Sequence, residues 1–460
     1  MMNLNFVFIF STFIVFSSAQ FMDRIGINYG KQGRDLPSPY RSIVLVQSMN
    51  ATMIKLYDSD PETLKLLAGT DLHVSIMVPN EEILELASND TLANQWVHEN
   101  VFAYYPSTMI RYIMVGNEVY SNHNEEQWEN LVLAMQHIRN TLHTHDIHNI
   151  KVGTPLAMDV LGSTFPPSNG SFRVDTLTTI VPLLQFLNRT SSFFFLDVYP
   201  YFPWSSNSHS IDLNFTLFMG NITFVDPVSN LTYTNLLDQM IDLVYFAMDK
   251  LGFSNIPIFI SETGWPSQGD LDQPGANVYN AATYNRNLVK KISANPPLGT
   301  PARPGTIIPT FLFSLYNEDL KDGPSTERHW GLWQPDGTTP VYPINLSGNK
   351  TDYGPLPQPI TNEAYKGKLW CVADRSVKPD QLRPVLKDIC TRLNRTCEAG
   401  LGPGKDCYDP VSVYWHASYA FSAYWAKYRN CGEACYFNGL ATLTTRNPSH
   451  GNCHFPSVTL

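Results

Sequence analysis

Cysteine is missing from most of this 460-residue chain, because residues 20–370 contain none. A disulfide framework is therefore excluded for that long segment. The seven cysteines all follow it, at Cys371, Cys390, Cys397, Cys407, Cys431, Cys435 and Cys453. Clustered cysteines in a short segment are typical of a disulfide-stapled module. Because seven is odd, we expect one thiol to be free or bonded to another chain.

Charge is also scarce, since charged residues make up 16% of the chain against a usual share of about a quarter. The formal net charge is −10, so the chain has no electrostatic reason to seek nucleic acid, and we expect no such partner. Aromatic residues reach 12%. Few charges and many rings favour an uncharged, hydroxyl-rich ligand whose sugar faces stack on those rings.

Several motifs of cofactor and metal chemistry are absent as well. The segment NYGKQG after the first predicted strand is not a glycine-rich phosphate loop, and the chain has neither G-x-S-x-G nor H-E-x-x-H. The histidines of HTHDIH, residues 143–148, fall in a predicted loop between a helix and a strand. We therefore expect no cofactor and no metal.

The apolar run at residues 6–16 is too short to span a bilayer. Ser17 and Ala19 occupy the small-residue positions of a cleavage site, so residues 1–19 predict a secretory signal peptide and a mature chain from Gln20. A membrane anchor is the alternative, because the terminal amine supplies the only positive charge there. We expect a secreted protein of the extracellular space and cell wall, without membrane insertion.

Ten N-x-Ser/Thr sequons agree with secretion and predict a glycoprotein. They lie at Asn50, Asn89, Asn169, Asn188, Asn214, Asn221, Asn230, Asn345, Asn349 and Asn394.

A recurring pattern fills the cysteine-free part: a short β-branched run, turn residues, then an amphipathic stretch. The predicted strands are residues 24–30, 53–58, 73–79, 111–118, 150–156, 193–200, 256–262 and 306–318. Eight apolar strands that alternate with helices predict an α/β fold, a parallel (β/α)₈ TIM barrel over residues 20–346. An open doubly wound sheet is the alternative.

Residues 347–367 are rich in Pro, Gly and polar residues and show no periodicity, which indicates a linker. The remaining residues, 368–460, form the predicted disulfide-rich, mainly helical module. We expect the chain to be a monomer.

Active sites of such barrels gather at the C-terminal ends of the strands. The candidates there form a polar ring of Asn28, Asp58, Asn117, Glu118, Asp197, Tyr199, Glu262, Tyr316 and Glu318. Glu118 ends the fourth predicted strand and Glu262 the seventh, roughly across the mouth of a barrel. Two carboxylates that face each other across a cleft are what hydrolysis of a glycosidic bond needs. A helix cap or a structural ion pair is the alternative for each alone.

These motifs resemble glycoside hydrolase family 17, the plant endo-1,3-β-glucanases, from about Ile25 to Tyr342. The matching segments are IGINYG, KLYDSDP, VGNEV, DVYPYF, SETGWPS and NEDLKDGPSTERHWGLWQPDG. The resemblance implies β-1,3-glucan as the partner and a retaining mechanism. It makes Glu118 the general acid/base and Glu262 the nucleophile. Asn117 would hold the sugar 2-hydroxyl, and Glu318 and Lys321 would be further charged residues near the site.

A retaining mechanism predicts a separation of about 5 Å between the two carboxyl groups. We expect Lys321 to lie near Glu262 and keep it ionised. Two departures from the family pattern, RDLP at residues 34–37 and Lys55 where relatives often carry Arg, are expected not to touch the carboxylates.

Aromatic residues flank the predicted ring. They are Tyr199, Tyr201, Phe202, Trp204, Trp265, Trp330 and Trp333. Each is either a stacking subsite along a glucan groove or part of the packing beneath the loops. The family pattern favours Tyr199 and Trp333 as substrate-binding residues.

The C-terminal module resembles the X8 domain, also called the family 43 carbohydrate-binding module, through WCVA, GPGKDCYDP, HASYAFSAYW and GNCHFP. This resemblance implies the disulfides Cys371–Cys435, Cys390–Cys397 and Cys407–Cys453, which leaves Cys431 as the odd thiol. Four residues at helical spacing either bind β-1,3-glucan or form the core: Tyr419, Phe421, Tyr424 and Trp425.

The sequence thus predicts a secreted, endo-acting, retaining β-1,3-glucosidase with a glucan-binding module. Two alternatives stay open. One is a wall protein that binds callose-type glucan with little catalysis. The other is transglucosylation at the same site, because water and sugar compete for one intermediate.

Overall fold

The computed structural model describes residues 24–122 and 124–460. The predicted signal peptide, residues 1–19, and the predicted mature start at Gln20 lie outside the described residues. Among the residues described, no helix combines the length and the apolar character that a membrane crossing requires.

Nine parallel strands form the barrel, in the spatial order β5-β4-β3-β2-β1-β13-β12-β9-β6. They are β1 Ile25–Tyr29, β2 Met53–Leu56, β3 His73–Val78, β4 Ile110–Val115, β5 Lys151–Gly153, β6 Pro155–Ala157, β9 Phe194–Asp197, β12 Ile258–Thr263 and β13 Thr310–Leu312. Each predicted strand overlaps at least one of them. The fifth is broken at Thr154: its first half, β5, pairs with β4 and its second half, β6, pairs with β9. This broken strand closes the barrel and confirms the predicted fold class.

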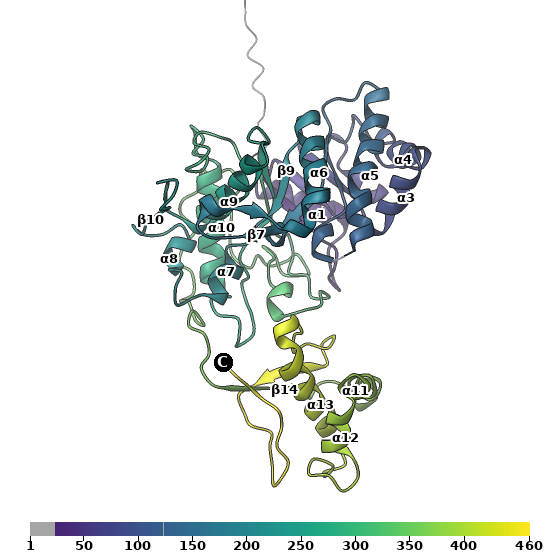
Figure 1. Cartoon of the computed structure of the whole chain (residues 1–460), viewed down its shortest axis with the longest axis vertical. Coiled ribbons are helices and arrows are strands. Elements are labelled where there is room, and N and C mark those ends of the chain that lie inside the picture. The colour runs from purple at the N-terminus through teal and green to yellow at the C-terminus, as the bar shows by residue number, and fades with distance from the viewer. Residues whose placement is uncertain (1–23, 123) are drawn as a thin grey trace, which may run out of the picture.

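Helices cover the outside of the barrel (Figure 1). They are α1 Pro39–Ser48, α2 Pro61–Leu66, α3 Ile83–Ser88, α4 Asp90–Val97, α5 Glu125–Thr144, α6 Leu177–Thr190, α7 Tyr201–Ser206, α8 Leu213–Thr216, α9 Leu236–Lys250 and α10 Val278–Ile292. The eighth strand has no such partner, because residues 313–367, all described, contain only one 3₁₀ turn, Ser325–Arg328. That segment is rich in Pro and Gly, which end helices.

Two short hairpins complete the barrel domain: β7 Leu161–Ser163 with β8 Ser171–Phe172, and β10 Phe224–Val225 with β11 Thr232–Tyr233.

Large side chains fill the barrel interior. One layer consists of Met53, Met77, Tyr112, Met114, Phe195, Phe259 and Phe311, all buried. Two glycines make room for it, because a Cβ at Gly26 would lie 2.6 Å from Met53 and Phe311, and one at Gly153 would lie 2.3 Å from Phe195. The interior is therefore a packed core, and only the strand ends above it are free to bind a ligand.

The predicted linker packs against the barrel. The Arg286 guanidinium lies 4.1 Å from the centre of the Tyr353 ring. Asn277 and Asn280 each donate a hydrogen bond of 2.8 Å to the side chain of Asn362. The backbone N–H of Gly275 donates to the carbonyl of Thr361 at 2.7 Å. Residues 347–367 are thus anchored at both ends.

The C-terminal module combines three helices, α11 Pro379–Leu393, α12 Arg395–Leu401 and α13 Val413–Tyr428, with a small antiparallel sheet. The sheet strands are β14 Lys368–Ala373, β15 Ala441–Thr444 and β16 Val458–Thr459. Figure 1 shows the module below the barrel.

Three disulfides fasten this small core. They join Cys371 to Cys435, Cys390 to Cys397 and Cys407 to Cys453, the pairs that the resemblance implies. Cys431 is exposed and free. The candidate glucan-binding residues Tyr419, Phe421, Tyr424 and Trp425 are all buried. They therefore belong to the core of the module. Of the two roles predicted for them, glucan binding and core packing, the structure shows the second.

Candidate active site

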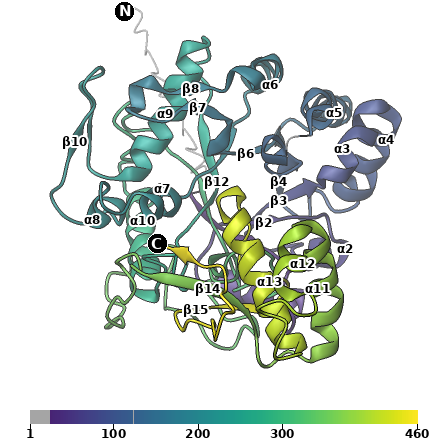
Figure 2. The same cartoon turned by 60° about the horizontal axis from the view of Figure 1, so that its bottom comes forward.

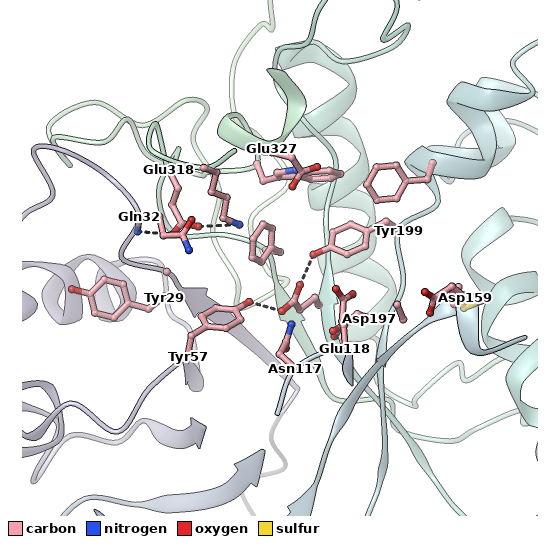
Figure 3. Close-up of a pocket in the computed structure, with 18 of the residues that line it drawn as sticks. Tyr29, Gln32, Tyr57, Asn117, Glu118, Asp159, Asp197, Tyr199, Glu318 and Glu327 are labelled. Carbon is pink, nitrogen blue, oxygen red and sulfur yellow. Dashed lines mark hydrogen bonds and ion pairs between the residues drawn. The ribbon is translucent and has the colours of Figure 1, made fainter. Parts of the chain in front are cut away.

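A cavity of about 800 Å³ opens at the C-terminal ends of the strands (Figure 3). Of the predicted polar ring, seven members line it: Asp58, Asn117, Glu118, Asp197, Tyr199, Glu262 and Glu318. The other two do not reach it. Asn28 is fully buried beneath the cavity, and Tyr316 is buried against Ser42, with 2.9 Å between the two hydroxyl oxygens.

Glu262 reaches the cavity because of a bulge in β12. Phe259 belongs to the barrel interior, whereas Ile258 and Ile260 pack in the outer core. Strict alternation would place Glu262 on the outer face with Ile260. The pairing of β12 shifts after Ile260 against both neighbouring strands. A bulge adds one residue and re-aims the side chains that follow, so Glu262 lies in the cavity with its side chain largely buried.

Three donors hold the Glu262 carboxylate. The Lys55 ammonium lies 2.9 Å from Oε1, the Tyr57 hydroxyl donates to Oε1 at 2.5 Å, and the Tyr199 hydroxyl donates to Oε2 at 2.7 Å. Burial alone would raise the pKa of Glu262, but the Lys55 charge and these hydrogen bonds outweigh it and lower that pKa below its ordinary value. Glu262 is therefore ionised at neutral pH.

The partner of Glu262 corrects two expectations. Lys321 does not pair with Glu262; its ammonium lies 3.3 Å from Oε2 of Glu318 and 4.1 Å from the centre of the Phe313 ring. Lys55, expected not to touch the carboxylates, is fully buried and forms the ion pair with Glu262. The reason is register: Met53, Lys55 and Tyr57 alternate along one strand, and Met53 faces the barrel interior.

Glu118 follows β4 on a tight backbone turn. It has a positive φ of 48°, and Gly116 has one of 69°; such a conformation is uncommon for a residue other than glycine and concentrates at functional sites. Asn80 holds the turn through both backbone groups of one residue, because its Oδ1 accepts from Asn117 N at 2.7 Å and its Nδ2 donates to Asn117 O at 3.1 Å. The N–H of Glu118 donates to Pro155 O at 3.1 Å.

The side chain of Glu118 meets the opposite electrostatic environment. Burial raises its pKa first, and the negative charge of Glu262 adds to that effect; Lys55 opposes both only in part. The result is a pKa of about 7. At mildly acidic pH the cavity thus holds one protonated and one ionised glutamate, which is the pair that general acid catalysis with a nucleophile requires.

Glu318 and Lys321 line another wall of the cavity. Besides Lys321, Glu318 accepts a hydrogen bond from the backbone N–H of Gln32 at 2.9 Å. Its carboxylate lies against Gly30, where a Cβ would approach Oε1 to 2.2 Å. Figure 3 shows Gln32 and Glu318 together on the side of the cavity away from Asp159.

The aromatic candidates divide into two groups. Tyr199, Phe202 and Trp330 line the cavity. Trp333 does not line it; its indole N–H donates to Met49 Sδ at 3.4 Å, and its role as a substrate-binding residue stays a prediction. The remaining three, Tyr201, Trp204 and Trp265, are buried beneath the loops and pack together.

Sequence reasoning missed several residues of the site. Tyr57, Phe313 and Glu327 line the cavity, and the buried Lys55 does not line it but pairs with Glu262. A lysine inside an apolar strand was an available signal, because lysine is almost never fully buried without a partner. Glu327 gave no such signal, since the segment after the eighth predicted strand has no periodicity. Within the described ranges, no group of three or more His, Cys, Asp or Glu side chains is arranged to hold a metal ion.

Known proteins resemble this chain over most of its length. It is 54% identical over 440 residues, 95% of this chain and 92% of the relative, to "Probable glucan endo-1,3-beta-glucosidase A6" of Arabidopsis thaliana. "Glucan endo-1,3-beta-glucosidase 3" of the same plant is 39% identical over 96% of this chain. Among solved structures, "CJP38, a beta-1,3-glucanase and allergen of Cryptomeria japonica pollen" is 40% identical, with a TM-score of 0.67, over 71% of this chain and 99% of its own.

Two family profiles match in succession. That of the X8 domain covers residues 369–442, within the disulfide-fastened module. That of the Glycosyl hydrolases family 17 covers residues 25–346, the whole barrel with both glutamates. The chain belongs to glycosyl hydrolase family 17.

Proposed function

We propose that the chain is an endo-acting, retaining glycosidase that hydrolyses internal 1,3-β-D-glucosidic bonds of a callose-type β-glucan. One observation carries the proposal: Glu118 and Glu262 line the same cavity, and their surroundings move their pKa values in opposite directions. The choice of a 1,3-β-glucan is supported by the names of the relatives.

The reaction assigns one role to each glutamate. The ionised carboxylate of Glu262 attacks the anomeric carbon while Glu118 gives its proton to the departing glycosidic oxygen, so the C–O bond breaks and a glucosyl ester forms on Glu262. Glu118, now ionised, takes a proton from water, and the hydroxide oxygen displaces Glu262 from the anomeric carbon. The product keeps its β configuration, and both glutamates return to their starting states.

Asn117 is proposed to hold the 2-hydroxyl of the reacting sugar. Its Oδ1 is buried and has no hydrogen-bond partner among the described residues, and Asn80 fixes its backbone. Glu318, Lys321 and Tyr199 are proposed to contact neighbouring hydroxyls and ring faces.

The X8 domain is proposed to bind the same glucan, at a site other than the predicted aromatic residues. A cavity of about 870 Å³ lies between α13 and the loop before the last strand, lined by Arg375, Tyr414, Trp415 and His450 among others. The Trp415 indole N–H is buried and unpaired among the described residues. A Trp415→Ala variant should lose retention on insoluble β-1,3-glucan while its hydrolysis of short oligosaccharides stays unchanged.

Secretion to the cell wall is proposed from the predicted signal peptide and from the sequons. All ten sequon asparagines are exposed or half-buried, so each is accessible to glycosylation. The protein is expected to act as a monomer.

Product analysis on a linear β-1,3-glucan tests the proposal. The wild type should release oligosaccharides of several lengths from the start, with β anomers formed first, and Glu262→Gln should release none. Binding without turnover by the wild type would support a glucan-binding wall protein instead. Products longer than the added oligosaccharide would indicate transglucosylation.

A further inference from the structure

Asp197 is a third carboxyl group in the cavity. It ends β9, two residues after Phe195, so it points to the barrel interior in the same way. Its neighbour across the sheet is Glu262, the residue paired with it in register. The residue is 2% exposed and lines the cavity, and Figure 3 shows its side chain beside Glu118.

The two oxygens of Asp197 have different surroundings. Oδ1 accepts a hydrogen bond from the hydroxyl of Ser261. Oδ2 is buried and has no hydrogen-bond partner among the described residues. A buried polar atom without a partner is costly and calls for an explanation. Since Asp197 lines the cavity, a bound ligand is the simplest partner for this atom.

The charges around Asp197 favour its neutral form. Facing groups from the other elements are Lys55 and Tyr57 of the second strand, Glu118 after the fourth, Tyr199 after the sixth and Glu262 of the seventh. The nearest cation, Lys55, is already paired with Glu262 at 2.9 Å. Burial, and then the charge of Glu262, raise the pKa of Asp197 well above its ordinary value.

We propose that Asp197 binds the substrate as a hydrogen-bond donor, with its Oδ2–H directed to a hydroxyl of the sugar held at Glu262. The identity of this ligand as a glucan rests on the proposed function. A neutral acid in this place adds a contact without adding a second negative charge beside the nucleophile. Asp197 is thus a substrate-binding residue that must carry a proton.

Two variants separate this role from others. Asp197→Asn keeps a neutral donor of the same shape, so kcat/KM should stay within about threefold of the wild type and both limbs of its pH profile should stay in place. Asp197→Leu removes the donor at similar volume and should lose about tenfold or more in kcat/KM, the size of one hydrogen bond. Thermal melts identify any variant that fails to fold.

Three outcomes overturn the proposal. If Asp197→Asn moves both limbs to lower pH, the carboxyl group was ionised. If Asp197→Leu matches Asp197→Asn in kcat/KM, Oδ2 makes no useful contact. Calorimetric binding of a β-1,3-gluco-oligosaccharide, run in parallel, separates a failure of this proposal from a failure of the proposed function. If the wild type binds the oligosaccharide without hydrolysing it, the affinities of the two variants still test the contact made by Asp197. Equal affinities of the two variants in that assay would also overturn the donor contact.

A second inference comes from the contact between barrel and module. Residues 266–277 and 319–330 form a two-loop platform beside the cavity. Gln273 Nε2 donates to Thr326 Oγ1 at 2.8 Å, and Ser325 N donates to Asp270 Oδ2 at 3.2 Å. The platform carries three residues that line the cavity, Lys321, Glu327 and Trp330.

The module contacts this platform in two places. Arg328 donates to the carbonyls of Lys321 and Gly323 at 3.0 and 3.1 Å, and its guanidinium lies 3.6 Å from the centre of the Tyr436 ring. Arg429 of the module lies 3.7 Å from the carboxylate of Asp272. Figure 2 shows the module in front of the barrel when its lower end is turned forward.

We infer that the module braces the platform and so positions the wall of the cavity that Glu327 and Trp330 form. Charge reversal tests it in the full chain. Asp272→Arg and Arg429→Asp should each increase amide hydrogen exchange in residues 319–330 and raise KM, whereas the double variant should restore both. Two results would overturn this inference. One is hydrogen exchange in residues 319–330 that is the same in both single variants as in the wild type. The other is exchange in the double variant that is no closer to the wild-type value than in the single variants.

Discussion

Glu262 and Glu118 carry the same carboxyl group at two strand ends, but the groups around the two carboxyls differ. Glu262 lies among one ammonium and two hydroxyls, all within 2.9 Å of its oxygens. Glu118 has no such partner among the described residues, and it faces the negative charge of Glu262. Burial acts to raise the pKa of both, but only at Glu118 does it outweigh the opposing effect of Lys55. The comparison shows that the placement of Lys55, more than depth in the cavity, decides which glutamate carries the proton.

Removing the ionised member should have the largest effect. Glu262→Gln deletes the nucleophile, and we expect kcat on β-1,3-glucan to fall on the order of 10⁴-fold or more, as with other groups that act as a unit. Initial rates of reducing-end release measure it. A variant that keeps more than a hundredth of wild-type kcat while folded would contradict the role.

Removing the protonated member should have a large but substrate-dependent effect. Glu118→Gln cannot protonate the leaving oxygen, so kcat on glucan should fall about 10²- to 10⁴-fold. The loss should be smaller for an aryl glucoside whose leaving group needs no proton. In the wild type, kcat/KM should fall as pH rises through about 7, where Glu118 deprotonates, and this limb should be absent in Glu118→Gln. Persistence of the limb in the variant would assign it to another group.

Neutralising Lys55 should bring the two glutamates closer in pKa. In Lys55→Met the Glu262 carboxylate loses its nearest cation, so its pKa should rise, and by more than that of Glu118, which forms no ion pair with Lys55. Because Glu262 must be ionised to react, the acidic limb of kcat/KM should move to higher pH by the same amount. Breaking a buried pair should also lower the free energy of unfolding by about 3–5 kcal/mol. Chemical denaturation at neutral pH measures this second effect.

Lys321→Met is the matched control for Lys55→Met. It removes a cation that lines the cavity, but one that pairs with Glu318. Its acidic limb should stay where the wild type has it, although affinity for glucan falls. Equal shifts in the two variants would show that net charge, rather than the specific pair, sets the pKa of Glu262.

The smallest effect is expected from removing one hydroxyl group, that of Tyr199. Tyr199→Phe removes the hydrogen bond to Oε2 of Glu262, which should lower kcat/KM about tenfold and move the acidic limb upward by less than Lys55→Met does. Tyr201→Phe is the control, because Tyr201 is buried two residues away and does not line the cavity. A Tyr199→Phe profile that coincides with the wild type would show that this contact does not matter for the nucleophile.

Much of the fold was predictable because its signals are local. The eight apolar runs predicted the barrel strands, and seven of the nine polar residues predicted at their ends line the cavity. The break at Thr154 and the missing eighth helix were not predicted, since each depends on how the barrel closes rather than on a local pattern.

The errors within the site have the same physical origin. Lys321 was placed beside Glu262 from its position in the chain, but the spatial neighbour is Lys55, which strand alternation brings to the interior with Met53. Alternation itself fails at Glu262, where a bulge reverses the facing of the side chain. Trp333 matched the family pattern as well as Trp330 did, and only the packing of the segment after β13 separates them.

Covalent trapping tests the central claim most directly. A 2-deoxy-2-fluoro β-glucosyl fluoride slows the second step more than the first, so the sugar should accumulate on the nucleophile. Peptide mass spectrometry after incubation at pH 5 should find the fluorosugar on Glu262 alone. The same reagent should leave the Glu262→Gln variant unlabelled. A label on Glu118 or Asp197, or an enzyme inactivated without any label, would contradict the account.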